Sequence, residues 1–211
     1  MTAVFLDLDG TLMKSHTGIL SSLEYAFRET GHHDLAEQDH TWLIGPPFVE
    51  SFAKLGITDV DPVLAAYREH YTREGMYNAV VYDGIFDALA DMTGAGRRLY
   101  LMTAKPHAYA KKITAHFELA EHMTGEYGPE LDGTRNWKGD LLAYALKETG
   151  ETPESSVMVG DRYHDMGAGA EVGMPSIAVR WGYGGPEDWT TAAALIDHPS
   201  ELPDTVARLL D

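Results

Sequence analysis

Two closely spaced aspartates, Asp7 and Asp9, stand in an apolar run that ends at Gly10. The residues around them, from Val4 to Leu8, are typical of a buried strand in a parallel sheet, so the acids would lie where that strand stops. If the strand stays extended, its alternating side chains put both carboxylates on one face, where they would repel each other unless a cation or a proton lay between them. The pair therefore indicates a metal site.

A second pair of acids, Asp161 and Asp165, follows another apolar run, residues 157–160. That run is short enough for a buried strand, and the acids come in the loop behind it. Carboxylate oxygens suit a hard cation such as Mg²⁺, which keeps several of its waters. Acids at the carboxyl ends of parallel strands lie in the crevice where open α/β sheets bind ligands. The two pairs together predict one metal centre.

Two further residues are placed to bind an anion. Thr103 ends the apolar run 98–103 and is followed by Ala104-Lys105-Pro106. Its hydroxyl and the backbone N–H groups behind it could hold a phosphoryl oxygen. Lys138 begins a helical pattern, where its ammonium group would bind phosphate and offset the nearby carboxylates. Acids for a metal and donors for an anion together favour phosphoryl chemistry.

These separated segments resemble, in chain order, the four signatures of the haloacid dehalogenase-like superfamily, which consists mostly of Mg²⁺-dependent phosphatases. Asp7-Leu8-Asp9-Gly10-Thr11 is similar to the first signature. Leu101-Met102-Thr103-Ala104-Lys105-Pro106 is similar to the second in its phosphoglycolate phosphatase-like branch, although Ala104 replaces a serine of that branch. Lys138 resembles the third signature, and Gly160-Asp161-x-x-x-Asp165 the fourth.

The resemblance implies a role for each acid. Asp7 would be the nucleophile, and Asp9 the general acid and base. The cofactor would be Mg²⁺, bound by the side chain of Asp7, the backbone carbonyl of Asp9, and Asp161 and Asp165 directly or through water. The implied reaction is hydrolysis of a small phosphomonoester through an aspartyl-phosphate, as in phosphoglycolate phosphatase-like enzymes.

The resemblance also implies which residues contact the substrate. Thr103 and Lys138 would stabilise charge on the transferring phosphoryl group. Gly45-Pro46-Pro47 is similar to the substrate-facing loop of a cap. Among the histidines, His107 and His164 are the two expected near the site. The residues predicted to bind the substrate are Gly10, Thr11, Ala104, Lys105, Gly45 and Pro46.

The stretches between the signatures show helix and strand patterns that would position these residues. After the first signature the apolar spacing is helical as far as residue 76, interrupted by a tight loop at Gly45-Pro46-Pro47. From residue 85 onward, helical patterns alternate with short apolar strands, which predicts a doubly wound parallel sheet. We therefore predict an α/β core from residues 1–15 and 80–211, with an all-helical cap, residues 16–79, inserted into it. The expected helices are 19–27, two within 40–56, 61–76, 85–92, 108–117 and 138–148, and the expected later strands are 98–103, 156–159 and 176–179.

Composition narrows the possible partners and location. The chain of 211 residues carries 33 acidic and 16 basic residues, and its net charge of −17 opposes binding to nucleic acid and to anionic membranes. It has no cysteine, which excludes disulfides and thiol chemistry and fits a reducing compartment. With no leader-like segment and no long apolar run, we expect a cytoplasmic monomer or homodimer acting on a small phosphorylated metabolite.

Several activities stay open. Asp9 disfavours a dehalogenase, because a halide leaves without a proton, whereas phosphatases and sugar-phosphate mutases need an acid there. No Arg or Lys lies between Arg28 and Lys54, which disfavours a second strongly anionic group on the substrate and so counts against glycolate-type specificity. A 5′-nucleotidase and a mutase are the enzymatic alternatives. A phosphoprotein-binding regulatory domain is the alternative from another class, although the sequence retains every signature acid and the signature lysine.

Overall fold

The computed structural model describes residues 2–46 and 48–211, and its α/β part is built on a parallel sheet. In order across the sheet, the strands are β5 (Gly125–Tyr127), β4 (Arg98–Met102), β1 (Ala3–Leu6), β6 (Ser156–Gly160), β7 (Ser176–Val179) and β8 (Ala194–Ile196). Each neighbouring pair in this sheet is parallel. The predicted doubly wound parallel sheet is confirmed.

Strand β1 lies at the centre of the sheet, between β4 and β6. Val4 is opposite Leu99 on one side and Val157 on the other. The chain fills the β4 side first and then crosses to the β6 side. The carboxyl end of β1 is therefore the switch point at which open sheets of this kind bind ligands.

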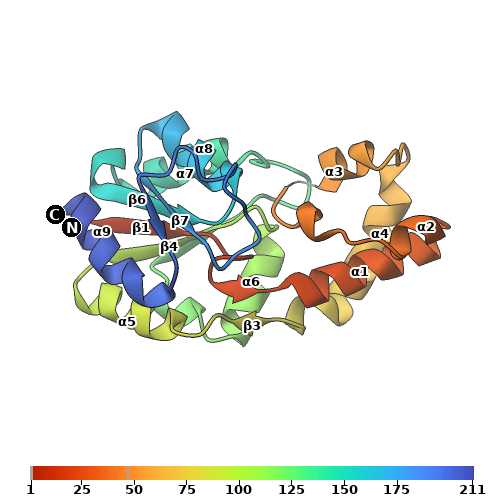
Figure 1. Cartoon of the computed structure of the whole chain (residues 1–211), viewed down its shortest axis with the longest axis horizontal. Coiled ribbons are helices and arrows are strands. Elements are labelled where there is room, and N and C mark those ends of the chain that lie inside the picture. The colour runs from red at the N-terminus through yellow and green to blue at the C-terminus, as the bar shows by residue number, and fades with distance from the viewer. Residues whose placement is uncertain (1, 47) are drawn as a thin grey trace.

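Helices cover both faces of the sheet (Figure 1). Ala3 and Phe5 of β1 pack with one group of helices, α7 and α8, whereas Val4 and Leu6 pack with the other group, α5, α6 and α9. Because both faces are covered, β1 is apolar throughout rather than alternating. These helices are α5 (Ile85–Gly94), α6 (His107–His116), α7 (Lys138–Thr149), α8 (Tyr163–Val172) and α9 (Leu202–Leu210).

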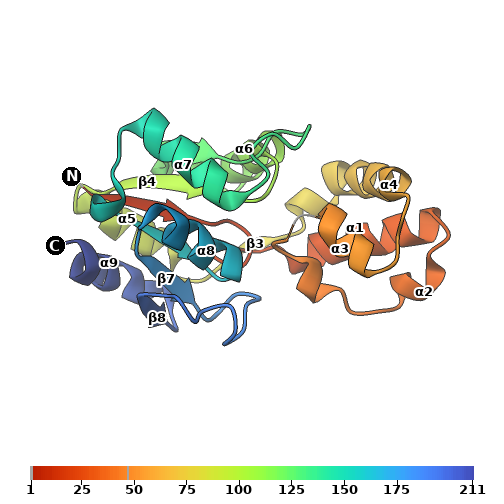
Figure 2. The same cartoon turned by 90° about the horizontal axis from the view of Figure 1, so that it is seen from above.

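A group of helices from residues 16–73 lies at one end of the molecule, on the far side of the sheet from the two termini (Figure 2). They are α1 (His16–Glu29), α2 (His33–Ala36), α3 (Phe48–Lys54) and α4 (Val60–Arg73). A short antiparallel pair, β2 (Met13–Lys14) and β3 (Val80–Val81), joins the chain where it leaves the α/β part and where it returns. The predicted helical cap is confirmed as an architecture, while its exact bounds, 16 and 79, stay a prediction.

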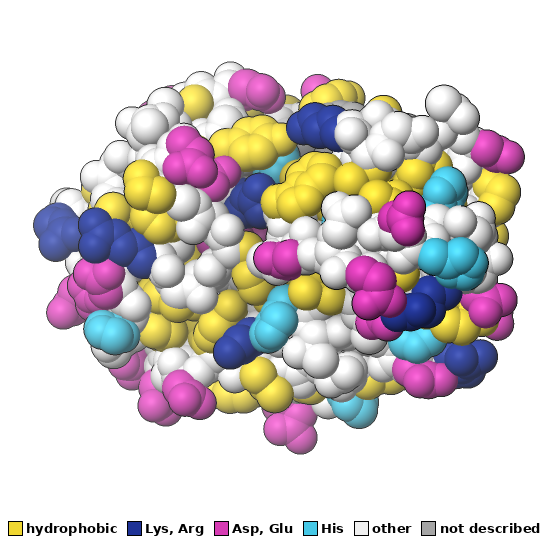
Figure 3. All heavy atoms as spheres, turned by 45° about the vertical axis from the view of Figure 1, so that its right-hand side comes forward, with side chains coloured by type: hydrophobic (Ala, Val, Ile, Leu, Met, Phe, Trp, Pro, Cys, Tyr) yellow, Lys and Arg dark blue, Asp and Glu magenta, His cyan; other side chains and the backbone are white. Residues whose placement is uncertain are grey.

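The surface over this helical cap mixes acidic, basic and apolar side chains on the face shown in Figure 3. Among the described residues, no helix has both the length and the apolar character needed to cross a membrane.

The structure departs from the predicted elements at a few places. Before Gly45 the expected helix is a single 3₁₀ turn, Thr41–Leu43, because the glycine and Pro46 leave no room for a further turn. Pro47 lies outside the described residues. Strands β2, β3, β5 and β8 were not predicted, since two or three residues are too few to show alternation.

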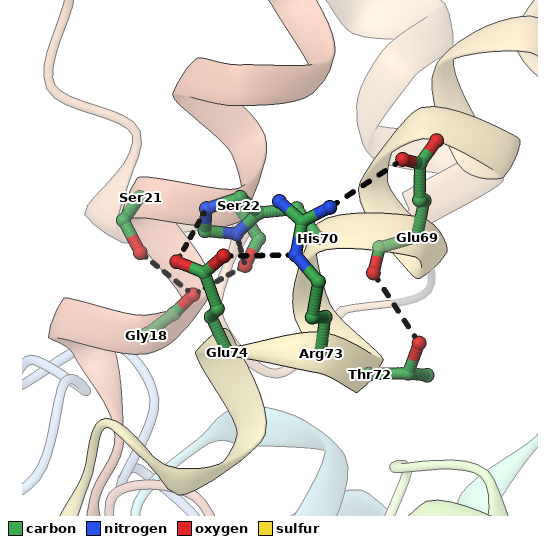
Figure 4. A network of polar contacts seen from close by, with 8 residues as sticks. All are labelled: Gly18, Ser21, Ser22, Glu69, His70, Thr72, Arg73 and Glu74. Atoms are coloured by element: carbon green, nitrogen blue, oxygen red, sulfur yellow. Dashed lines mark hydrogen bonds and ion pairs between the residues drawn. The ribbon is translucent and has the colours of Figure 1, made fainter.

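A close crossing joins α1 to the segment that follows α4. A Cβ atom on Gly18 would overlap the backbone oxygen of Gly75. Polar contacts lie beside this crossing (Figure 4). Ser22 Oγ donates to the Gly18 carbonyl oxygen at 2.7 Å and lies 2.9 Å from His70 Nδ1. The other ring nitrogen, His70 Nε2, lies 3.7 Å from a carboxylate oxygen of Glu74. The two ends of the helical cap are thus held against each other.

We expect Gly18→Ala to lower the free energy of unfolding by about 1–3 kcal/mol, because overlap with the backbone of Gly75 outweighs the better helix propensity of alanine. Gly94→Ala is the matched control, since a Cβ atom there meets nothing within 4 Å, and it should be neutral or stabilise by up to about 1 kcal/mol. Urea unfolding of both variants measures the difference. Equal effects of the two substitutions would contradict the close crossing.

Candidate active site

Three buried carboxylates meet at the carboxyl end of β1. Asp7 directly follows β1, Asp161 directly follows β6, and Asp165 lies in the first turn of α8. One oxygen atom of each lies within 4.8 Å of the others, and all three residues are buried. The structure therefore brings together three of the acids that the sequence suggested for a metal ion.

Lys138, the first residue of α7, places its ammonium group between two of these acids. Its Nζ donates to Asp7 Oδ1 at 2.6 Å and also to Asp165 Oδ1. Burial would lower the pKa of Lys138, but Asp165 and Asp7 together outweigh it and raise that pKa. Burial is also the largest influence on Asp7 and raises its pKa to about 7, against the opposing effect of Lys138. One ammonium group thus faces more negative charge than it can neutralise.

Asp161 has an oxygen atom that the protein leaves free. Its Oδ2 accepts a hydrogen bond from the backbone N–H of Tyr183 at 2.6 Å, whereas its Oδ1 is buried with no hydrogen-bond partner among the described residues. Burial is the largest of the influences that raise the pKa of Asp161, followed by Asp165. A buried carboxylate oxygen without a partner, beside two further carboxylates, is a donor set that fits a hard divalent cation.

The carboxylate of Asp9 lies outside this acidic triad. Strand β1 ends at Leu6 and the chain turns at Leu8, so the condition of an extended strand, on which a shared face for Asp7 and Asp9 depended, is not met. Asp9 Oδ2 instead lies 2.9 Å from Nζ of Lys105. Its carboxylate is not part of the acidic triad, and binding of a metal through its backbone carbonyl stays a prediction.

A cavity of about 310 Å³ opens beside these charged groups, between the sheet and the helical cap. Thr103, at the end of β4, is buried at its edge, and its Oγ1 accepts a hydrogen bond from the backbone N–H of Lys105 at 3.1 Å. The predicted site residues that line the cavity are Asp7, Asp9, Gly45, Pro46, Thr103, Ala104, Lys105, Lys138 and Asp165.

Two predicted substrate-binding residues are not among those that line the cavity. Gly10 has a φ of +88°, and a Cβ atom there would overlap the carboxylate of Asp161, so this glycine lets the turn approach the acid closely. Thr11 is buried, and its carbonyl oxygen accepts a hydrogen bond from the indole N–H of Trp181 at 2.9 Å. Of the two histidines expected nearby, His164 lines the cavity and His107 does not.

Several cavity residues were missed at the sequence level. Arg162 donates to the backbone carbonyl of Ile44 at 2.7 Å and so ties the loop behind the fourth signature to the cap. Tyr67 and Tyr71 of α4 line the cavity with Arg68 between them. The four-residue spacing of the tyrosines puts both on one side of the predicted helix 61–76, and it is the signal in the sequence that could have identified them.

The chain resembles known proteins in both sequence and structure. A family model described as haloacid dehalogenase-like hydrolase matches residues 4–179. The tyrosine-protein kinase PtkA of Mycobacterium tuberculosis is 39% identical over 213 residues, which cover 99% of this chain and 69% of that protein. A 5′-nucleotidase of Pseudomonas aeruginosa is 36% identical over 190 residues, covering 88% of this chain and 85% of that one. A crystal structure described as a predicted phosphatase from Clostridium acetobutylicum superposes with a TM-score of 0.91 at 29% identity, covering 99% of each chain.

The chain belongs to the haloacid dehalogenase-like hydrolase family. The family predicted from the four signatures is therefore confirmed. The relatives named as a 5′-nucleotidase and described as a phosphatase support the predicted phosphatase activity.

The raised pKa of Asp7 predicts a pH dependence of stability when a chelator keeps the protein free of metal. Its pKa rises from 3.8 in the unfolded chain to about 7 in the folded protein, so the folded state retains a proton that the unfolded state loses. The stability from this group is complete below the unfolded pKa and is lost as the pH rises through the folded one. Asp7→Asn removes this contribution. Between pH 5 and pH 8 the free energy of unfolding should therefore fall less in the variant than in the wild type, by roughly 1–3 kcal/mol.

Urea unfolding at the two pH values measures this difference. Asp91→Asn, which changes an exposed acid of α5, is the matched control and should leave the pH dependence as in the wild type. An equal fall in stability for wild type and Asp7→Asn would contradict the raised pKa of Asp7.

Proposed function

We propose that this protein is a Mg²⁺-dependent phosphatase that hydrolyses a small phosphomonoester through an aspartyl-phosphate on Asp7. The observation that supports it most is the meeting of Asp7, Asp161 and Asp165 around Lys138, beside a cavity large enough for a small substrate. A nucleophile, a cation-binding acid group and a phosphate-binding ammonium group are the parts that phosphoryl transfer through a carboxylate requires.

In the first step, a carboxylate oxygen of Asp7 forms a bond to phosphorus while the ester P–O bond breaks. Asp9 gives its proton to the departing oxygen, which leaves as an alcohol. In the second step, the oxygen of a water molecule bonds to phosphorus, Asp9 takes up the proton of that water, and the bond between phosphorus and Asp7 breaks. Inorganic phosphate is released, and both acids return to their starting states.

The neighbouring groups orient these acids and stabilise charge. Lys138 holds Asp7 through Oδ1, which leaves the other oxygen free to attack. The ammonium group and the Thr103 side chain lie at the cavity edge, where they would bind the phosphoryl oxygens. Asp7, Asp161 and Asp165 would hold Mg²⁺, which when bound would offset the negative charge of the transferring group.

The cavity walls favour one class of leaving group over another. Phe48, Tyr67, Tyr71 and Tyr109 all line it, and the rings of Phe48 and Tyr67 lie 4.7 Å apart between centroids. Such a wall suits a flat, uncharged ring. We therefore propose a nucleoside 5′-monophosphate as the first candidate substrate, in line with the relative from Pseudomonas aeruginosa that is named a 5′-nucleotidase.

The cations of the cavity decide how well a second anionic group of the substrate could bind. Lys105, Lys138 and Arg162 each form ion pairs with acids of the protein. Arg68 of α4 lines the cavity and has no ion pair among the described residues. The sequence argument had looked for Arg and Lys only between Arg28 and Lys54, so it did not consider Arg68. A substrate with a second anionic group would thus have the Arg68 guanidinium to bind, so the choice of a nucleotide over phosphoglycolate rests on the aromatic wall and not on the cations.

We expect wild-type protein to release inorganic phosphate from a panel of phosphomonoesters when Mg²⁺ is present and to stop when a chelator is added. Asp7→Asn should lower this rate at least about a thousandfold, because it removes the nucleophile. Asp91→Asn should retain the wild-type rate. A colorimetric phosphate assay measures all three proteins.

Four outcomes would replace the proposal. Undiminished release by Asp7→Asn would remove the covalent mechanism. Transfer of the phosphoryl group to a second sugar hydroxyl would indicate a mutase, and transfer from ATP to a tyrosine side chain would indicate the activity for which PtkA is named. Binding of a phosphoprotein without turnover of any ester would indicate a regulatory domain.

We expect kcat/KM to be at least about tenfold higher for nucleoside 5′-monophosphates than for phosphoglycolate, because the aromatic wall can pack against a base and phosphoglycolate has no ring. Tyr67→Leu should raise KM for the nucleotides about three- to tenfold and leave KM for phosphoglycolate nearly unchanged. Phe86→Leu, at an exposed ring of α5 that is not among the cavity-lining residues, is the control. Steady-state kinetics on both substrates test this, and faster turnover of phosphoglycolate would contradict it.

A further inference from the structure

Lys105 connects the helical cap to the carboxylate of Asp9. Its Nζ lies 2.9 Å from Asp9 Oδ2 and donates to the hydroxyl oxygen of Tyr71 at 2.7 Å. The ammonium group also lies 4.8 Å from the centre of the Tyr71 ring. Tyr71 belongs to α4 of the cap, whereas Asp9 belongs to the turn that follows β1. One ammonium group therefore bridges the two parts of the molecule.

This bridge is buried and closely held. Lys105 and Tyr71 are 9% and 2% exposed. The backbone N–H of Lys105 donates to Thr103 Oγ1, and a Cβ atom on Gly128 would lie 2.6 Å from the carbonyl oxygen of Lys105, so the segment before α6 packs closely against the backbone at Gly128. Within the described part of the chain, the polar partners of the ammonium group are Asp9 and Tyr71. Loss of either partner would leave one N–H of the buried Lys105 ammonium group without its acceptor.

The cap meets the α/β part near this bridge through aromatic contacts as well. The rings of Tyr71 and Tyr109 of α6 lie 6.2 Å apart, and the ring of Tyr77, just after α4, lies 4.6 Å from that of His116. Both partners belong to the helix that begins two residues after Lys105. The position of α4 is therefore fixed against the same segment that carries the ammonium group.

We propose that Tyr71 is a positioning residue for Asp9, acting through Lys105. The tyrosine hydroxyl fixes the ammonium group, the ammonium group fixes one oxygen of Asp9, and the other oxygen stays available for the proton of the leaving group. This inference rests on the proposed function, in which Asp9 protonates the departing oxygen. Its consequence is that a side chain of the cap controls how well the enzyme cleaves esters of poor leaving groups.

Substrates that differ in leaving group separate this role from a merely structural one. Adenosine 5′-monophosphate is an alkyl ester, whose oxygen needs a proton as it departs. The phenolate of 4-nitrophenyl phosphate leaves without one. A misdirected Asp9 should therefore slow the first substrate and spare the second. The ratio kcat/KM is the correct measure, since it reports the steps up to departure of the leaving group.

We expect Tyr71→Phe, which keeps the ring and removes the hydroxyl, to lower kcat/KM about tenfold for adenosine 5′-monophosphate and less than about twofold for 4-nitrophenyl phosphate. Asp9→Asn should show the same pattern with a larger effect, lowering kcat/KM at least about a hundredfold for the alkyl ester. Tyr77→Phe is the matched control, because it also removes a hydroxyl and keeps the ring, at an exposed tyrosine that is not among the cavity-lining residues. It should leave the ratio between the two substrates as in the wild type.

A double variant tests the route through the lysine. In a Lys105→Met background, Tyr71→Phe should cause no further change in the ratio between the substrates, and additive losses would overturn the route. Equal losses on both substrates in Tyr71→Phe, or none on either, would overturn the positioning role while leaving the phosphatase intact. Phosphate release that persists in Asp7→Asn would instead overturn the proposed function, and this inference with it.

Discussion

Burial of several carboxylates around one ammonium group is the constraint on which the rest of the structure depends. Asp7, Asp161 and Asp165 are buried, and Lys138 bonds to two of them. Buried charge is costly unless it is paired, and one cation cannot pair with three acids. The fold must therefore bring four segments to the same point and leave space for a further positive charge, which is why β1 and β6 end side by side and α7 begins over them.

The helical cap is connected to this charged centre by bonds to residues next to the acids. Arg162, which follows Asp161 directly, donates to the carbonyl oxygen of Ile44, and Lys105, which pairs with Asp9, donates to Tyr71. These contacts close the cavity with the same groups that orient the acids. A substrate that entered the cavity would therefore meet the cap and the proposed catalytic acids through one connected set of side chains, and the cap contributes mainly aromatic surface to the cavity.

The sequence predicted the central strands and the acids that follow them, because each of these strands is an apolar run that stops at charged residues. This pattern can be recognised without knowing how the rest of the chain packs. It did not predict β5 or β8, whose three residues carry no periodicity. Nor could it assign Tyr71 or Arg162, since their contacts depend on how the cap packs against the sheet. Counting cations only between Arg28 and Lys54 missed Arg68, because the helix that carries it reaches the cavity from farther along the chain.

The most informative difference between sequence and structure concerns Asp7 and Asp9. Two residues apart on an extended strand, they would have shared one face and one cation, but the strand ends at Leu6 and the turn sends the two carboxylates to different partners. Asp7 pairs with Lys138 inside the acidic triad, and Asp9 pairs with Lys105 beside the cap. Distinct surroundings are what allow two neighbouring acids to perform different chemistry, one as a nucleophile and one as a proton donor. The turn after β1, rather than the spacing of the aspartates, is therefore what would separate their roles.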